Sequence, residues 1–371
     1  MVATKDSFLD FMQGAFEKLL VEAYENGADE DILLEAVGPA YERVRAKTKS
    51  IFLPALKRNA AKMLRDRRKQ IAGFEKRNFA RWREAFDRFE MLVVMVEEIG
   101  QEQDLLLRPE AIARQDYKFE ALAHLLPRAV LVAREMLCLL KGGYPDSALA
   151  RWRSLYELSV LGQFIFENDV DIALRYLASF DFRALRAARE YNDHAERGDL
   201  LAFDEEELSA LEARAAGVEA QIGERLKKDY DWAHPALVSQ FPTLKPDRVD
   251  FSHIELSVGM DHWRPRFRYA TQNVHAGYRP HATLLGVCES QEPVALVGPS
   301  NSGFVDPLQM GAISLVHVAT TFLLVKPNLD RLVLIDILTE LSDELPVIAI
   351  RLEEETLAAH RKATSSRTDD G

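Results

Sequence analysis

The segment RPRFRYATQNVHAGYRPH, residues 264–281, contains residue types that could cleave a phosphodiester. Arg268 and His275 are seven residues apart, a spacing that places two side chains on one face of a helix. The imidazole would act as general base or acid on a ribose 2′-hydroxyl, and the guanidinium would hold the phosphate and stabilise its developing charge. That chemistry needs no metal. The alternative is a structural histidine that is hydrogen-bonded near a helix end.

Polar and cationic neighbours extend this hypothetical catalytic site. Thr271 falls on the same helical face, and either Thr271 or Asn273 would orient the scissile phosphate. A cationic cluster beside the stripe would bind the nucleic acid; its members are Arg264, Arg266 and Arg279. The sequence thus offers a catalytic set of Arg268, His275, Thr271 and Asn273, with RNA as the substrate.

Arg153 and Glu157 lie one helical turn apart, and their neighbours on the same helical face are apolar: Leu149, Tyr156, Val160 and Leu161. We expect them to form an ion pair against apolar surface, where desolvation makes an ion pair an expensive way to gain stability. Such a pair indicates either a functional site or a structural contact that fixes the helix register.

Residues 57–88 reverse the charge balance of the chain, with twelve Lys and Arg against four acidic residues. One interpretation is a phosphate-facing stripe, for which we select Arg65, Arg68 and Lys69 as nucleic-acid-binding residues. The other is a solvated helix face or the docking site of an acidic protein partner. Because the whole chain has a net charge of −12, any contact with nucleic acid must be local.

Neither a metal site nor a cofactor is indicated. Four histidines lie close in sequence, but none has the i, i+4 spacing of a helical zinc site, and no Cys pair accompanies them: His253, His262, His275 and His281. The segment GPSNSGF has two glycines with the spacing of a phosphate-binding loop. Phe304 and Val305 occupy the places where that loop has Lys and Ser or Thr, so we interpret the segment as a tight turn.

Bulk composition predicts a folded cytoplasmic protein. The apolar share is 47% and the charged share 29%, which is typical of globular chains. Two cysteines in 371 residues cannot build a disulfide framework, and Cys138 is expected inside an apolar helix. The first residues carry charges where a signal peptide would be apolar, and the most apolar segment, 310–325, is shorter than the ~20 residues of a membrane span.

Helical periodicity dominates the chain and predicts an all-α fold, a multi-helix bundle core with an N-terminal helical arm. We expect the arm, including the basic helix, over residues 1–100, a helical core domain over 101–360, and a disordered tail over 361–371. Helices are predicted at 6–25, 30–48, 54–99 in one or two pieces, 117–141, from the cap at Asp146 or Ser147 to about 167, and at 170–196, 203–229, 265–277, 308–325 and 329–360. Asp146 or Ser147 is the predicted N-cap of the helix that follows Gly142 and Gly143.

Three pieces of the chain carry a resemblance to a known family: LLKGGYPDSALARWRSLYEL, DYDWAHPAL leading to RYATQNVHAG, and GPSNSGFVDP. They resemble the bacterial family called domain of unknown function 5677, over about residues 115–340. The resemblance implies an α-helical core in which Arg153, Glu157 and His275 match recurring polar positions. The chain also resembles, more distantly, the HEPN class of helical ribonucleases, whose motif is Arg, four to six residues, then His. Tyr269 stands where that class usually has Asn, Asp or His.

These resemblances imply one function, and the residues leave another open. The first is a metal-independent endoribonuclease in bacterial stress or phage defence, a homodimer in which Arg153 and Glu157 support the catalytic residues from behind. The second is a non-catalytic interaction module in which the basic helix 57–88 recruits an acidic protein partner. Fold alone does not separate the two.

Overall fold

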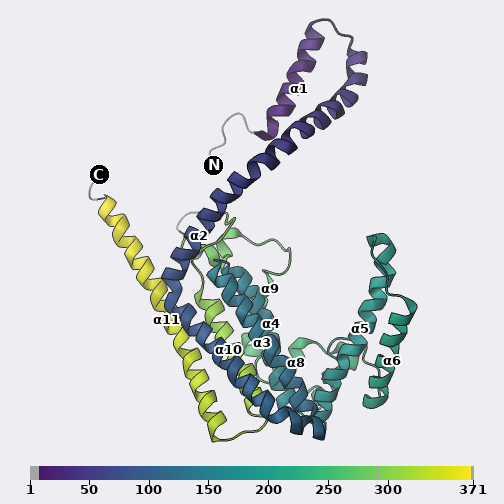
Figure 1. Ribbon diagram of the computed structural model, residues 1–371, viewed down its shortest axis with the longest axis vertical. Coiled ribbons are helices and arrows are strands. Elements are labelled where there is room, and N and C mark those ends of the chain that lie inside the picture. The colour runs from purple at the N-terminus through teal and green to yellow at the C-terminus, as the bar shows by residue number, and fades with distance from the viewer. Residues whose placement is uncertain (1–7, 291–292, 369–371) are drawn as a thin grey trace. The chain divides into compact units, whose positions relative to one another are not determined.

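The computed structural model describes residues 8–290 and 293–368, and the predicted all-α class is confirmed, since no strand occurs in these ranges (Figure 1). The long helices are α1 (Phe8–Glu25), α2 (Glu30–Arg114), α3 (Tyr117–Lys141), α4 (Pro145–Glu167), α5 (Val170–Gly198), α6 (Glu205–Ile222), α10 (Val305–Leu323) and α11 (Leu329–Thr368). Three short helices lie between α6 and α10: α7 (His234–Leu237), α8 (Phe251–Ser257) and α9 (Arg264–Thr271). No helix in the described residues is long and apolar enough to cross a membrane.

The chain divides into two compact units, residues 1–73 and 74–371. In the first unit α1 and the start of α2 are joined by a turn at Asn26 and Gly27, and the ring of Phe16 meets that of Tyr41 edge to face at 5.7 Å. This division falls inside the arm predicted for residues 1–100, whose own boundary stays a prediction.

Helix α2 is one continuous element, whereas the sequence suggested a break between residues 48 and 54. Pro54 removes the hydrogen bond to the carbonyl of Ser50, a loss that normally disrupts a helix. Ser50 and Pro54 are both exposed, so water can solvate that carbonyl, and the helix continues.

The core of the second unit is the hairpin of α3 and α4, with α10 packed against both (Figure 1). The indole N–H of Trp152 on α4 donates to the hydroxyl of Ser314 on α10 at 2.9 Å, and both side chains are buried. Helix α10 also packs against α11, and α5 pairs with α6. The predicted bounds of α3, 117–141, agree with the structure. Asp116 caps the start of this helix, and the helix ends at the predicted stop, Gly142 and Gly143.

The start of α4 differs from the prediction. Its N-cap is Tyr144, with Pro145 in the first turn, instead of Asp146 or Ser147. The carboxylate of Asp146 is used elsewhere: it accepts hydrogen bonds from the backbone N–H groups of Leu285 and Gly286, each at 3.0 Å. A long-range contact therefore outcompetes the local cap at this residue.

The helix predicted at 203–229 is shorter than expected, since α6 ends at Ile222, and one further expectation differs from the structure. Cys138 lies in α3, but its side chain is exposed and not buried in the helix packing. Helix α11 runs to Thr368, into the segment 361–371 for which a disordered tail is predicted; that tail stays a prediction, and residues 369–371 lie outside the described residues.

Candidate functional site

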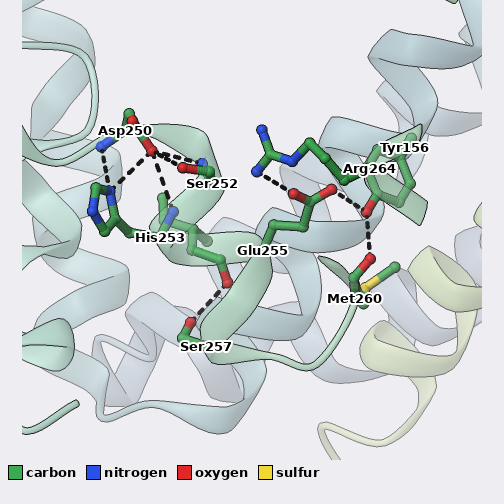
Figure 2. A network of polar contacts seen from close by, with 9 residues as sticks. Tyr156, Asp250, Ser252, His253, Glu255, Ser257, Met260 and Arg264 are labelled. Carbon is green, nitrogen blue, oxygen red and sulfur yellow. Dashed lines mark hydrogen bonds and ion pairs between the residues drawn. The ribbon is translucent and has the colours of Figure 1, made fainter. Parts of the chain in front are cut away.

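A fully buried carboxylate forms the centre of the polar network between α4, α8 and α9 (Figure 2). Glu255 on α8 is 0% exposed and forms an ion pair with Arg264 at the start of α9. The hydroxyl of Tyr156 on α4 lies 2.5 Å from the other carboxylate oxygen and 2.9 Å from the carbonyl oxygen of Met260. Burial, followed by the hydrogen bond to Glu255, raises the pKa of this hydroxyl, so it remains a proton donor at neutral pH.

Arg153 and Glu157 form the expected ion pair on α4, with 3.2 Å between the guanidinium and the carboxylate. The pair is half-buried, and the guanidinium carbon of Arg153 lies 4.8 Å from the centre of the Phe267 ring. Burial raises the pKa of Glu157 although Arg153 opposes the shift. Burial and then the charge of Glu157 raise the pKa of Tyr230 to about 12. The contact between Arg153 and Phe267 joins α4 to α9.

The residues predicted for catalysis do not share a helical face. Helix α9 ends at Thr271, so the predicted helix 265–277 is wrong beyond that residue, and His275 lies in a bend four residues later. The side chains of Arg268 and His275 are both exposed and have no hydrogen bond or ion pair in the described part of the chain. The hydroxyl of Thr271 donates to the carbonyl of Phe267 at 2.8 Å.

Asn273 lies two residues after the end of α9 and is engaged by a tertiary contact. Its side-chain oxygen accepts a hydrogen bond from Arg279, which also donates to the hydroxyl of Tyr269 at 2.9 Å. Through Arg279, these contacts link the segment after α9 back to Tyr269 on the helix. The local sequence has no strong helix stop before Gly277, so the prediction overran.

The cationic cluster predicted beside α9 is already neutralised. Each arginine pairs with a carboxylate of the same unit, in the pairs Arg264–Glu255, Arg266–Asp306 at 2.6 Å and Arg279–Asp146 at 3.5 Å. Arg279 is only 10% exposed, and Arg264 is 23% exposed. A guanidinium held this way has little capacity left for a phosphate.

The basic segment of α2, in contrast, contains cations that have no paired carboxylate among the described residues. Arg65, Arg68 and Lys69 are exposed and form no ion pair with any described residue. The same holds for the neighbouring Lys57, Arg58, Lys62, Arg67, Lys76 and Arg77. The cations at the end of the predicted stretch 57–88 are engaged, since Arg81 pairs with Glu289, Arg83 with Asp87, and Arg88 with Glu344. Within the predicted stretch 57–88, the uncompensated positive charge therefore lies at residues 57–77.

One group of side chains in the second unit has the donor types for a metal. The Sγ of Cys288 and carboxylate oxygens of Glu289 and Glu353 lie within 4.8 Å of one another. Glu289 is already bound to Arg81 at 2.7 Å. Burial, followed by the charge of Glu353, raises the pKa of the Cys288 thiol to about 11, so the thiolate that a metal requires is scarce at neutral pH. This geometry is weak as a metal site.

Residues 119–293 match the family of unknown function DUF5677. The match includes the buried network, the Arg153–Glu157 pair and the segment from Arg268 to His275, and the basic segment of α2 precedes it. No curated protein and no solved structure matches the chain. The comparisons thus agree with the resemblance to that family and lend no support to the likeness to HEPN-class ribonucleases.

Glu255 and Asp146 were missed as polar centres of the fold. Each binds groups far away in sequence: Tyr156 is 99 residues from Glu255, and Gly286 is 140 residues from Asp146. The available signal was a carboxylate inside a short apolar run, as in HIEL around Glu255. Such a residue must find a partner when its helix is buried.

Proposed function

We propose that this protein is a non-catalytic interaction module that binds an acidic protein partner through residues 57–77 of α2. The observation that supports this proposal is the set of nine exposed Lys and Arg side chains in that segment that have no ion pair among the described residues. Only two acidic residues, Asp66 and Glu75, lie within the same stretch. Charge without an internal partner is available for an external one.

Four of these cations are arranged along one side of the helix. Arg58, Lys62, Arg65 and Lys69 follow one another at intervals of four, three and four residues, which keeps them on a single face. We call these four residues the basic stripe. Exposed apolar side chains lie on the opposite side of α2, among them Met63 (64% exposed) in this segment and Leu56 (65% exposed) directly before it. Cations combined with exposed apolar groups favour a protein surface over a phosphate backbone.

Fluorescence anisotropy with a labelled polyglutamate peptide tests this function. The wild type should bind the peptide, and the basic-stripe variant Arg58→Glu/Lys62→Glu/Arg65→Glu should bind at least about tenfold more weakly, because three attractions become repulsions. The matched control is Lys227→Glu/Lys245→Glu/Arg248→Glu, which changes the same charge at three exposed cations outside the stripe. Equal losses in the two variants would show a net-charge effect and refute the proposal. Tighter binding of a single-stranded RNA probe than of the peptide would replace the protein partner with nucleic acid.

A metal-independent endoribonuclease in bacterial stress or phage defence is the second candidate function. The observation in its favour is that Arg268 and His275 are both exposed and have no partner in the described residues. Cleavage of a mixed RNA pool in the presence of EDTA, by the wild type and by His275→Ala, tests it. Products with 2′,3′-cyclic phosphate ends from the wild type alone would support it, and an intact pool with a folded wild type would eliminate it.

A further inference from the structure

An acidic groove in the second unit matches the basic stripe. The groove of about 640 Å³ runs between α2 and α11, and its carboxylates include Asp336, Glu340 and Asp343 on α11. All three are exposed and form no ion pair among the described residues. We call them the acidic stripe. The remaining lining consists of two aliphatic residues and polar or charged side chains: Val347, Ile348, Thr339, Glu84, Arg88 and Glu344.

The two stripes have the same spacing. Arg58, Lys62 and Arg65 stand at positions i, i+4 and i+7 of a helix, and so do Asp336, Glu340 and Asp343. At a rise of about 1.5 Å per residue, each set spans roughly 10 Å on one face. Two such helices laid side by side can place each cation opposite a carboxylate.

Apolar surface in the groove suits the rest of a basic helix. Val347 is 67% exposed and lies one turn beyond Asp343 on the same face of α11, at the i+11 position that Lys69 occupies in the basic stripe. The methylene stems of Lys and Arg side chains cover apolar groups of this kind while their charged ends remain near carboxylates. The groove therefore fits a helical cationic ligand better than it fits a free cation.

We infer that the acidic partner of the basic stripe is a second copy of this chain, whose acidic stripe receives it. The inference rests on the proposed function, since it names the partner of the same basic segment. Each copy carries both stripes, so two copies can exchange them reciprocally. A closed twofold dimer of that kind contains two identical contacts and six cation–carboxylate pairs.

Sedimentation equilibrium of the full chain over a range of concentrations tests the inference. The wild type should form dimers at about 0.05 M salt and dissociate at about 1 M salt, where charges are screened within about 3 Å. The basic-stripe variant should dimerise at least about tenfold more weakly, and so should the acidic-stripe variant Asp336→Lys/Glu340→Lys/Asp343→Lys. Far-UV circular dichroism verifies that each variant is folded.

Charge exchange provides the sharpest result. An equimolar mixture of the two variants should form a heterodimer, because the reversed basic stripe of one meets the reversed acidic stripe of the other. The chain with all six substitutions should dimerise by itself again. Neutral versions, with Gln in place of Lys, Arg and Glu and with Asn in place of Asp, should weaken dimerisation without creating the heterodimer.

Three outcomes would overturn the inference. The first is a wild type that remains monomeric at low salt at every concentration. The second is a dimer that the acidic-stripe variant leaves unchanged. The third is a charge reversal that leaves the chain monomeric but alters its frictional ratio in sedimentation velocity, which would mean that the two stripes pair within one chain. Failure here is distinguishable from failure of the proposed function, because the acidic-stripe variant retains its basic stripe and should still bind the polyglutamate peptide.

Discussion

Substitution of Arg264 by Met tests the buried network directly, because it leaves Glu255 without its cation. Glu255 is 0% exposed, so the lost ion pair cannot be replaced by bulk water. Removal of one partner from a buried ion pair costs about 3–5 kcal/mol. Arg264 itself is 23% exposed, so the wild-type pair is partly screened. We therefore expect a loss near the lower limit, about 3 kcal/mol.

A double-mutant cycle separates the interaction between Glu255 and Arg264 from the other effects of the Arg264→Met substitution. Glu255→Gln should cost about 1–2 kcal/mol, because the amide oxygen can still accept the hydroxyl proton of Tyr156 while Arg264 reaches water. The double variant Glu255→Gln/Arg264→Met should be less destabilised than the sum of the two single variants, with a coupling of about 1 kcal/mol or more. Urea unfolding with analysis of the midpoints measures each corner of the cycle.

Arg266→Met is the matched control. It removes the same side chain two residues away, where the pair with Asp306 is more exposed, with 52% and 28% of the two side chains accessible. An exposed pair contributes about 0–1 kcal/mol, so this variant should unfold almost like the wild type. Equal losses in the two arginine variants would refute the argument that burial of Glu255 sets the energy.

Three further stability changes are expected. Arg153→Met should lower the free energy of unfolding by about 1–2 kcal/mol near pH 8 and by less near pH 5, because Glu157 can take up a proton in the acid solution and then needs no cation. Gly303→Ala should cost about 2 kcal/mol or more, since Gly303 has a φ of +77° and a Cβ would lie 2.3 Å from the carbonyl oxygen of Leu285. Phe304→Ala should cost about 3–5 kcal/mol, because the ring is fully buried. Urea and thermal unfolding measure all three.

The sign of the pH dependence follows from the direction of the Glu157 shift. Burial raises its pKa in the folded chain, so the folded state binds this proton more readily than the unfolded state does. Its contribution is therefore present below the ordinary carboxyl pKa and is lost as the pH rises through the folded value. Loss of Arg153 raises that pKa further, so an equal effect of Arg153→Met at both pH values would contradict this argument. For the glycine, Gly298→Ala is the control, because a Cβ there meets nothing within 4 Å.

Local signals predicted the hairpin of α3 and α4 well. The apolar residues of α3 lie on its buried face, and Asp116 caps its start. After the helix ends, Gly143 adopts a φ of +86°. Pro145 then supplies the fixed φ of a first helical turn. Each of these signals acts within a few residues, so the sequence contains them in full.

Long-range contacts decided the elements that the sequence did not predict. Asn273, two residues after the end of α9, accepts a hydrogen bond from Arg279. Asp146 does not cap α4 as predicted, because its carboxylate binds backbone N–H groups about 140 residues later. Whether Cys138 is exposed depends on which face of α3 the neighbouring helices cover. Periodicity indicates that a helix has a buried face, but the tertiary arrangement determines its ends and its polar partners.

Positive charge is useful for recognition only where the fold has not already neutralised it. The arginines around α9 combine residue types suited to phosphate chemistry, yet Arg264, Arg266 and Arg279 each face a carboxylate of their own unit. A ligand there would have to displace an existing ion pair, and for Arg264 it would leave Glu255 buried and unpaired. The cations of the basic stripe have no such competitor among the described residues, so a partner gains their full electrostatic attraction. This difference, more than the number of arginines, is why the basic stripe is the stronger candidate for function.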